Sequence, residues 1–131
     1  MTVFVDTSAL YALLDEADLY HKAAVSTLAS LRGTECVTHA YVVVETLALA
    51  GRRLGWGAVT RLLDGILPIL EVRMVDEELH RSTMLAYRES GSDRVSLVDR
   101  TSFALMRRER ITQAFAFDDD FAREGFGLAT A

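Results

Sequence analysis

Short apolar, β-rich runs alternate with helical stretches along this chain. Strands are expected at 2–5, 36–38, 71–75 and 113–117, with an edge strand at 126–129. Helices are expected at 9–14, 18–31, 40–54, 56–67, 76–89 and 96–110, with a final helical turn at 118–124. Strands separated by helices need crossover connections, so they pair in parallel and are covered on both faces. The sequence therefore predicts an α/β fold with a central parallel sheet.

The composition predicts one compact domain over residues 1–131. Half of the 131 residues are hydrophobic, which is enough to build a core in a chain of this length. The single Cys36 cannot form an internal disulfide, which fits a reducing, cytoplasmic location. No signal peptide opens the chain, and no uncharged apolar run reaches the roughly 18 residues of a membrane span. We expect a cytoplasmic protein with no membrane association.

Two acidic residues follow predicted strands, and two more lie within apolar helices. Ligands of parallel sheets bind outside the carboxyl ends of the strands, where Asp6 follows Val5 and Asp118 follows Phe117. As an alternative role, each of these acids caps the helix that follows. An unpaired carboxylate within an apolar helix is costly to bury, which makes Glu45 and Asp99 candidate ligands. Their alternatives are an arginine salt bridge and a solvated helix face, respectively.

The four acids together predict a metal site. Carboxylates that meet at one edge of a sheet repel one another unless a cation lies between them. Ligands that are all oxygen select a hard ion such as Mg²⁺ or Mn²⁺, and such an ion suits hydrolysis of a phosphodiester. The formal charge of −5 does not exclude a nucleic-acid partner, because setting aside the four acids of the predicted metal site leaves −1 for the rest of the chain. His21, His39 and His80 are not spaced as a metal cluster.

The acidic segments resemble, in order, the four motifs of the PIN-domain family. They are Val3-Phe4-Val5-Asp6-Thr7-Ser8-Ala9-Leu10, Glu45-Thr46, Ser96-Leu97-Val98-Asp99 and Phe117-Asp118-Asp119-Asp120-Phe121. The resemblance runs from Val3 to about Phe126. At this length and with this layout, the chain is most similar to VapC-type toxins, the ribonuclease half of prokaryotic toxin–antitoxin pairs.

The resemblance implies a three-layer α/β/α sandwich and an Mg²⁺-dependent endoribonuclease, with Mn²⁺ as the other candidate ion. It also implies an RNA substrate, a homodimer and a protein antitoxin that blocks the site. The family's metal-binding and catalytic carboxylates correspond to Asp6, Glu45, Asp99 and Asp118. Thr7 and Ser8 correspond to hydroxyls that orient phosphate or water. Asp118 is favoured as the fourth acid, while Asp119 and Asp120 stay open.

Three further features leave alternatives open. Arg100 stands where the family usually has a small residue, so it either adds a cation near the site or turns outward. The apolar residues between Trp56 and Leu70 either pack in the core or form a surface for a dimer mate or an antitoxin helix. A binding or regulatory module whose acids hold a structural ion, without hydrolysis, is the alternative function.

Overall fold

Within the part of the chain that the computed structural model describes, residues 1–129, five strands form one parallel sheet. They are β1 (Thr2–Val5), β2 (Glu35–His39), β3 (Glu71–Arg73), β4 (Gln113–Phe115) and β5 (Gly127–Leu128). Their order is β3-β2-β1-β4-β5, and each neighbouring pair is parallel. Strand β1 therefore lies in the centre of the sheet, between β2 and β4.

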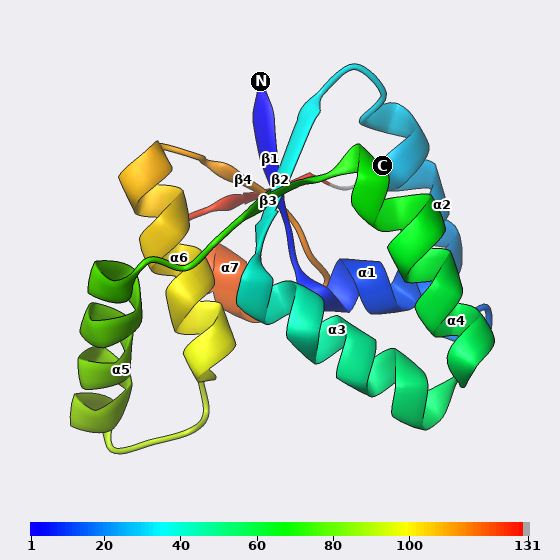
Figure 1. The fold of residues 1–131 in the computed structure, drawn as a ribbon. Coiled ribbons are helices and arrows are strands. Elements are labelled where there is room, and N and C mark those ends of the chain that lie inside the picture. Colours follow the sequence, from blue (N-terminus) through cyan, green and yellow to red (C-terminus); the bar gives the residue numbers. More distant parts are fainter. Residues whose placement is uncertain (130–131) are drawn as a thin grey trace.

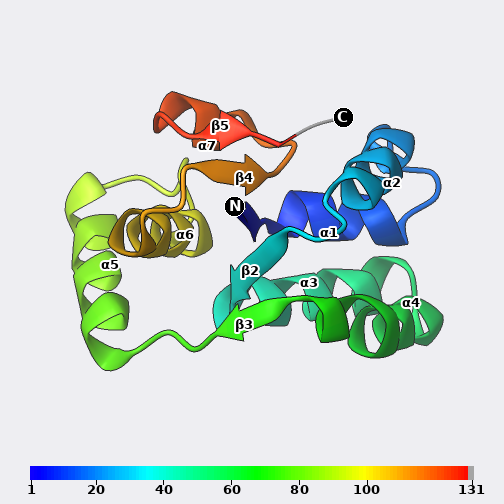
Figure 2. The same ribbon diagram turned by 90° about the horizontal axis from the view of Figure 1, so that it is seen from above.

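Helices cover both faces of this sheet. They are α1 (Thr7–Leu14), α2 (His21–Ser30), α3 (Ala40–Arg53), α4 (Trp56–Arg61), α5 (Glu77–Ser90), α6 (Leu97–Glu109) and α7 (Asp119–Arg123). Figures 1 and 2 show α1 to α4 on one side of the sheet, with α5 and α6 on the other. The predicted three-layer α/β/α arrangement is confirmed.

The core is built around β1, whose side chains are buried on both faces of the sheet. Val3, Phe4 and Val5 are at most 1% exposed. A continuous apolar run is what a central parallel strand requires, because helices cover both of its faces. Burial of each of these side chains stabilises the fold by about 1.5–3 kcal/mol. The sheet thus gives a rigid base to whatever follows Val5.

Strand β4 ends two residues earlier than its apolar pattern predicts. The backbone N–H of Asp6 donates to the carbonyl of Phe115 at 3.0 Å, and this bond closes the β1–β4 ladder. Two residues further along, the N–H of Phe117 donates to the hydroxyl of Ser8 at 2.9 Å instead of to strand β1. Asp118 therefore follows a short loop rather than the strand itself, and the expected strand at 113–117 is too long.

Other helices and strands were also predicted to extend beyond the bounds that the structure shows. Helix α2 begins at His21 rather than near Asp18, because the carboxylates of Asp15 and Asp18 accept backbone N–H groups and form turns. The predicted helix at 56–67 is α-helical to Arg61, and it continues as a π-helical turn η1 (Leu62–Ile66) and a 3₁₀ turn η2 (Leu67–Ile69). Pro68, which has no N–H to donate, lies in the last turn. Strand β3 ends at Arg73 rather than at Val75.

Helix α3 is apolar in sequence but is not buried on all sides. One stripe packs inward, formed by Val42, Thr46 and Ala50 at a spacing of four residues. Val44 is 65% exposed, and Glu45 is only half-buried. The outer face of α3 stays exposed because the helix packs mainly against α1 and α4.

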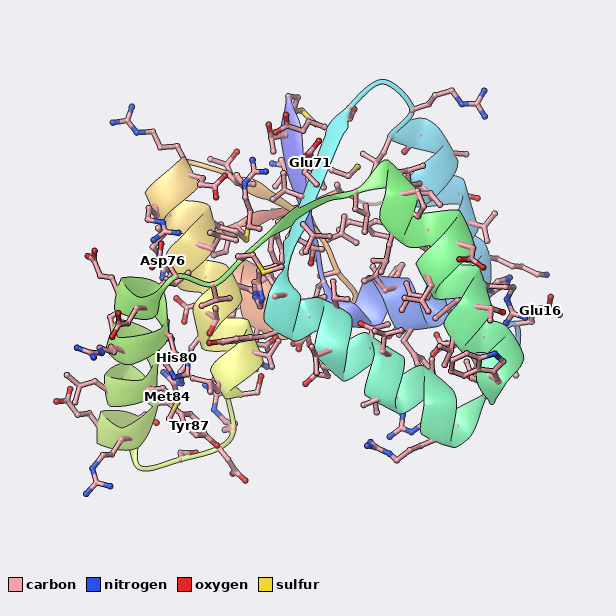
Figure 3. All side chains as sticks on the ribbon, viewed as in Figure 1. Glu16, Glu71, Asp76, His80, Met84 and Tyr87 are labelled. Carbon is pink, nitrogen blue, oxygen red and sulfur yellow. The ribbon has the colours of Figure 1, made fainter. Side chains whose placement is uncertain are left out.

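Helix α5 lies outside α6 and packs against it (Figures 1 and 3). Asp76 caps its first turn by accepting the N–H of Leu79 at 2.8 Å, and Asp76 also pairs with Arg108 of α6 at 2.7 Å. His80, on the same helix, is hydrogen-bonded to the hydroxyl of Tyr41 on α3. Figure 3 shows His80 and Met84 along α5. These contacts hold α5 against α6 and α3.

Candidate metal centre

Asp6 lies at the carboxyl end of the central strand and is 3% exposed. Its Oδ2 accepts the backbone N–H of Ser8 at 3.1 Å and the Ser8 hydroxyl at 2.7 Å. Its Oδ1 is buried and has no hydrogen-bond partner among the described residues. Burial raises the pKa of this carboxyl from its usual 3.8 to about 6. A buried oxygen without a donor is costly, so Asp6 presents an open ligand atom.

Asp99 and Asp118 are positioned by helix caps. Ser96 caps α6, and its hydroxyl accepts the N–H of Asp99 at 3.0 Å. Asp118 caps α7 by accepting the N–H of Asp120 at 2.8 Å. These caps satisfy helix-end donors that would otherwise be unpaired. They also fix the two carboxylates at the same edge of the sheet as Asp6.

One carboxylate oxygen from each of Asp6, Asp99 and Asp118 lies within 4.8 Å of the other two. The pKa of Asp99 is raised to about 8, first because the group is buried and then because Asp6, Asp118, Asp120 and Glu45 repel its charge. Close carboxylates in a buried setting favour either a proton or a cation between them. The donor set, all oxygen and with an unpartnered Oδ1, fits a hard divalent ion.

A cleft of about 400 Å³ surrounds these oxygens and contains every residue that the sequence predicted for the site. Glu45 lines this cleft from α3, although it is not part of the group of three close oxygens. The described residues lining the cleft are Asp6, Thr7, Ser8, Tyr11, Asp18, Tyr20, Glu45, Leu49, Arg53, Ser96, Asp99, Phe117 and Asp118.

The two predicted hydroxyls differ in their environment. The hydroxyl of Ser8 donates to Asp6 and accepts the N–H of Phe117 at 2.9 Å, so its proton is already used within the protein. The Oγ1 of Thr7 is buried and has no hydrogen-bond partner among the described residues. Ser8 therefore positions Asp6 and the loop before Asp118, while Thr7 keeps a hydroxyl available for a ligand.

Two charged residues near the predicted ligands, Asp120 and Arg100, form ion pairs or hydrogen bonds with other groups. The carboxylate of Asp120 pairs with Arg94 at 3.4 Å and with Arg123 at 3.3 Å, and Asp119 is exposed. Arg100 donates to the carbonyl of Val95 at 3.2 Å and is not among the residues that line the cleft. Of the three consecutive aspartates, Asp118 is the one that joins the group of close oxygens.

Seven residues that line the cleft were not predicted as site residues: Tyr11, Asp18, Tyr20, Leu49, Arg53, Ser96 and Phe117. Arg53 had a detectable signal, because Glu45, Leu49 and Arg53 are each four residues apart on α3 and so form one stripe of the helix. Tyr20 had none, since it lies in the turn before α2 and is brought to the cleft by the fold.

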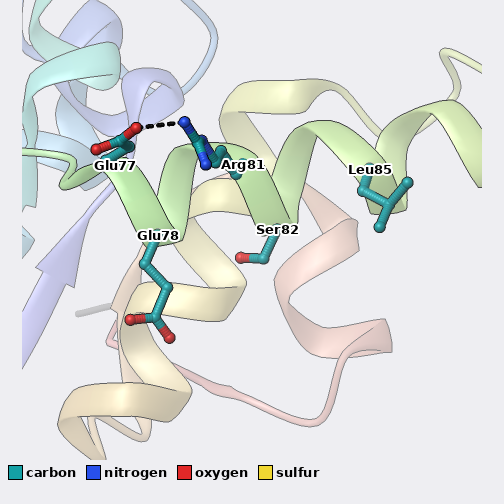
Figure 4. Close-up of a pocket in the computed structure, with 5 residues that line it drawn as sticks. All are labelled: Glu77, Glu78, Arg81, Ser82 and Leu85. Carbon is teal, nitrogen blue, oxygen red and sulfur yellow. Dashed lines mark ion pairs between the residues drawn. The ribbon is translucent and has the colours of Figure 1, made fainter.

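A second hollow, of about 480 Å³, lies on α5 (Figure 4). It is lined by Glu77, Glu78, Arg81, Ser82 and Leu85, and Glu77 pairs with Arg81 at 2.5 Å. An exposed pair of this kind is worth only about 0.3–0.5 kcal/mol. The hollow is a feature of a solvated helix face. Separately, no helix of residues 1–129 has the length and apolar character needed to cross a bilayer.

A parallel sheet of this order, with aspartates gathered at the end of its central strand, is the arrangement expected of a PIN domain. The sequence profile of the PIN domain matches residues 3–127, and the chain belongs to this family. Over 125 residues, 95% of each chain, it is 34% identical to proteins named 23S rRNA-specific endonuclease VapC20 from two strains of Mycobacterium tuberculosis, CDC 1551 / Oshkosh and H37Rv.

Solved structures support the same relationship. The crystal structure of Mycobacterium tuberculosis VapC20, described as a Sarcin-Ricin loop cleaving toxin, matches with a TM-score of 0.88 and 32% identity, covering 98% of this chain and 99% of that one. FitAcB from Neisseria gonorrhoeae matches with a TM-score of 0.70 and 17% identity, covering 98% and 96%, which shows a common fold. The resemblance to PIN-domain toxins seen in the sequence is confirmed.

Proposed function

We propose that this protein is a divalent-metal-dependent endoribonuclease and the toxin of a toxin–antitoxin pair. The observation that carries the proposal is the group of three close carboxylate oxygens from Asp6, Asp99 and Asp118, together with the unpartnered Oδ1 of Asp6. The relatives named as rRNA-specific endonucleases support RNA as the substrate and ribosomal RNA as its class. A cytoplasmic location follows from such a substrate.

Asp6, Asp99 and Asp118 would hold the metal ion, and Glu45 would add a fourth negative charge from the rim of the cleft. Mg²⁺ is the first candidate and Mn²⁺ the second, because both prefer oxygen ligands. When bound, the ion would offset the repulsion among the acids, draw the substrate phosphate into the cleft and make water a stronger nucleophile.

The protein's own groups prepare the site before substrate arrives. The N–H and hydroxyl of Ser8 hold one oxygen of Asp6, so the first turn of α1 is directed at this carboxylate. The free hydroxyl of Thr7 is available to donate to a phosphate oxygen or to water. No histidine is among the described residues that line the cleft, so acids rather than an imidazole must accept the proton of the nucleophile.

The test is cleavage of purified ribosomal RNA with and without Mg²⁺. We expect Asp6→Asn to lower the rate by at least about 100-fold, since even loss of groups around metal ligands costs about 10–100-fold. The exposed Asp64 provides a matched control, and Asp64→Asn should retain activity. Attack by water leaves a 5′-phosphate and a free 3′-hydroxyl, so a 2′,3′-cyclic phosphate would contradict the mechanism. Binding of metal and RNA without cleavage would support the regulatory module instead.

The predicted homodimer and antitoxin also belong to this proposal. Leu62 and Leu70 are buried in the core, whereas Trp56 is 73% exposed and Ile69 is 58% exposed. Exposed apolar side chains on one segment are typical of a protein interface. Light scattering of the purified protein tests the dimer, and loss of cleavage on co-expression with the neighbouring gene product tests the antitoxin.

A further inference from the structure

The cleft has an aromatic wall formed by Tyr20 and Phe117. Their rings are stacked, with centroids 4.7 Å apart and planes 11° apart. Phe117 in turn packs edge-on against Phe115, which is fully buried in β4, with centroids 6.0 Å apart. Tyr20 is 44% exposed. The three rings thus run from the core to the solvent, and the outermost one lies at the rim of the acidic cleft.

Hydrogen bonds hold this wall in place. The N–H of Tyr20 donates to the carboxylate of Asp18 at 2.8 Å, and the ring of the next residue, His21, bonds to the carbonyl of Ala12 at 2.7 Å. The N–H of Phe117 is bound by the same Ser8 hydroxyl that holds Asp6. The Ser8 hydroxyl therefore holds both Phe117 of the wall and the carboxylate of Asp6. A ligand that contacted both groups would lose little free energy in ordering their side chains, because they are already held in place.

The charges of the cleft make such a wall useful to an RNA ligand. Five carboxylates line the cleft, from Asp6, Asp18, Glu45, Asp99 and Asp118. Among the described residues of the lining, Arg53 is the one basic side chain, and its guanidinium lies 5.7 Å from the centre of the Tyr11 ring. A phosphate chain is repelled by this surface except where a cation lies. Contacts that do not depend on charge must therefore supply much of the affinity.

We propose that Tyr20 and Phe117, together with Arg53, form a subsite for a single unpaired nucleotide beside the cleaved phosphate. This inference rests on the proposed ribonuclease function and assigns residues that would hold one nucleotide of its substrate. The base stacks on the face of Tyr20 that Phe117 does not cover, and Arg53 binds a backbone phosphate oxygen. A base within a duplex cannot offer its face to a side chain, so the subsite selects nucleotides in loops and single strands.

The first test measures binding of a fluorescently labelled hairpin RNA in Mg²⁺, with Asp99→Asn as the background that prevents cleavage. Tyr20→Leu keeps an apolar contact with Phe117 but removes the aromatic face, and it should weaken binding by about tenfold or more. Tyr20→Phe and Tyr20→Trp should bind like the background protein. Tyr87→Leu is the matched control, because Tyr87 is a tyrosine of α5 that does not line the cleft. Equal affinity of Tyr20→Leu and its background would overturn the proposal.

The second test uses the salt dependence of RNA affinity to distinguish the phosphate contact of Arg53 from the stacking contact of Tyr20. Arg53→Gln should reduce the slope of log affinity against log salt by about 0.7, the value for one phosphate contact on a single strand. Arg52→Gln is the control, because Arg52 carries the same charge on the same helix but does not line the cleft. Tyr20→Leu should lower affinity without changing the slope. An unchanged slope in Arg53→Gln would remove Arg53 from the subsite.

The outcomes distinguish this subsite from the function on which it rests. If the native protein cuts no RNA, the ribonuclease proposal fails, whatever the binding variants show. If it cuts RNA and Tyr20→Leu leaves KM unchanged, the subsite fails and the ribonuclease stands. If it cuts RNA and Tyr20→Leu raises KM while Tyr20→Phe restores it, both stand. Thermal melts of each variant identify any loss of fold.

Discussion

The carboxylates of Asp6 and Asp99 hold their protons more strongly in the folded protein than in the unfolded chain. Their pKa values rise from 3.8 to about 6 and about 8, chiefly because they are buried. The folded state therefore binds more protons than the unfolded state between these values. Without metal, this pair of acids destabilises the fold progressively as the pH rises from about 4 to about 8.

We therefore expect Asp99→Asn to stabilise the metal-free protein at pH 8 but not at pH 4. The gain should be about 1 kcal/mol or more, since one pKa unit corresponds to about 1.4 kcal/mol. Urea unfolding in a chelator at pH 4, 6 and 8 measures it, with Asp64→Asn as the control. A loss of stability at pH 8 would mean that Asp99 makes a structural contact instead.

The hydroxyl of Ser8 links the end of β1 to the segment after β4, because it bonds to both Asp6 and Phe117. Ser8→Ala leaves the partly buried N–H of Phe117 without its acceptor and removes a donor from Asp6. We expect a cost of about 1–3 kcal/mol in unfolding free energy, together with reduced cleavage. Ser26→Ala, at an exposed position of α2, should cost little. If Ser8→Ala matched that control in both measurements, its role as a positioning residue would be wrong.

At the scale of elements, the acids of the site depend on where helices begin. Asp6, Asp118 and Ser96 each cap a helix, and Asp99 lies in the first turn of α6. The positive ends of three helix dipoles are therefore directed toward one region, which partly offsets the negative charge gathered there. The capping role that competed with the metal role in the sequence turns out to be compatible with it.

Removing the cap of α6 should affect stability and activity together. Ser96→Ala is expected to cost about 1 kcal/mol in unfolding free energy and to loosen the turn that carries Asp99. Ser96→Thr, which keeps a capping hydroxyl, should restore both. Denaturant unfolding and initial cleavage rates provide the two measurements. Full activity in Ser96→Ala would show that Asp99 is placed by packing alone.

The elements that could be predicted are those with a continuous local pattern. The run at Val3–Val5 can only be a buried strand, and helical spacing identified α3, α5 and α6 to within two residues. The end of β4 could not be predicted, because it depends on Ser8, which is more than 100 residues away in the chain. Likewise, the exposure of Val44 reflects which neighbours cover α3, and no local pattern records this.

Site residues could be predicted from the sequence where their residue type was unexpected among the neighbouring residues. Acids after a strand or within an apolar helix are costly unless they have a role, and all four predicted acids line one cleft. The aromatic wall could not be found in this way. Tyr20 and Phe117 are ordinary residues in their own segments, and only their contact across the fold makes them notable.

At the scale of the whole molecule, metal should act as a stabilising ligand of the folded state. A free metal concentration 100 times the dissociation constant would add about 2.7 kcal/mol to the free energy of unfolding. We expect the melting temperature to rise with Mg²⁺ or Mn²⁺ in the native protein and to rise much less in Asp6→Asn. Equal ionic strength supplied as a sodium salt is the control. A rise that is the same in both proteins would place the ion elsewhere.

The order of the strands has a consequence for how the protein is made. The central strand β1 is synthesised early, but its partner β4 and Asp118 come more than 100 residues later. At about 5–20 residues per second, the ribosome needs several seconds to bridge that interval. Until then the acids cannot meet, and a nascent chain has no complete centre with which to cut RNA. The acidic centre is therefore completed only after nearly the whole chain has been made.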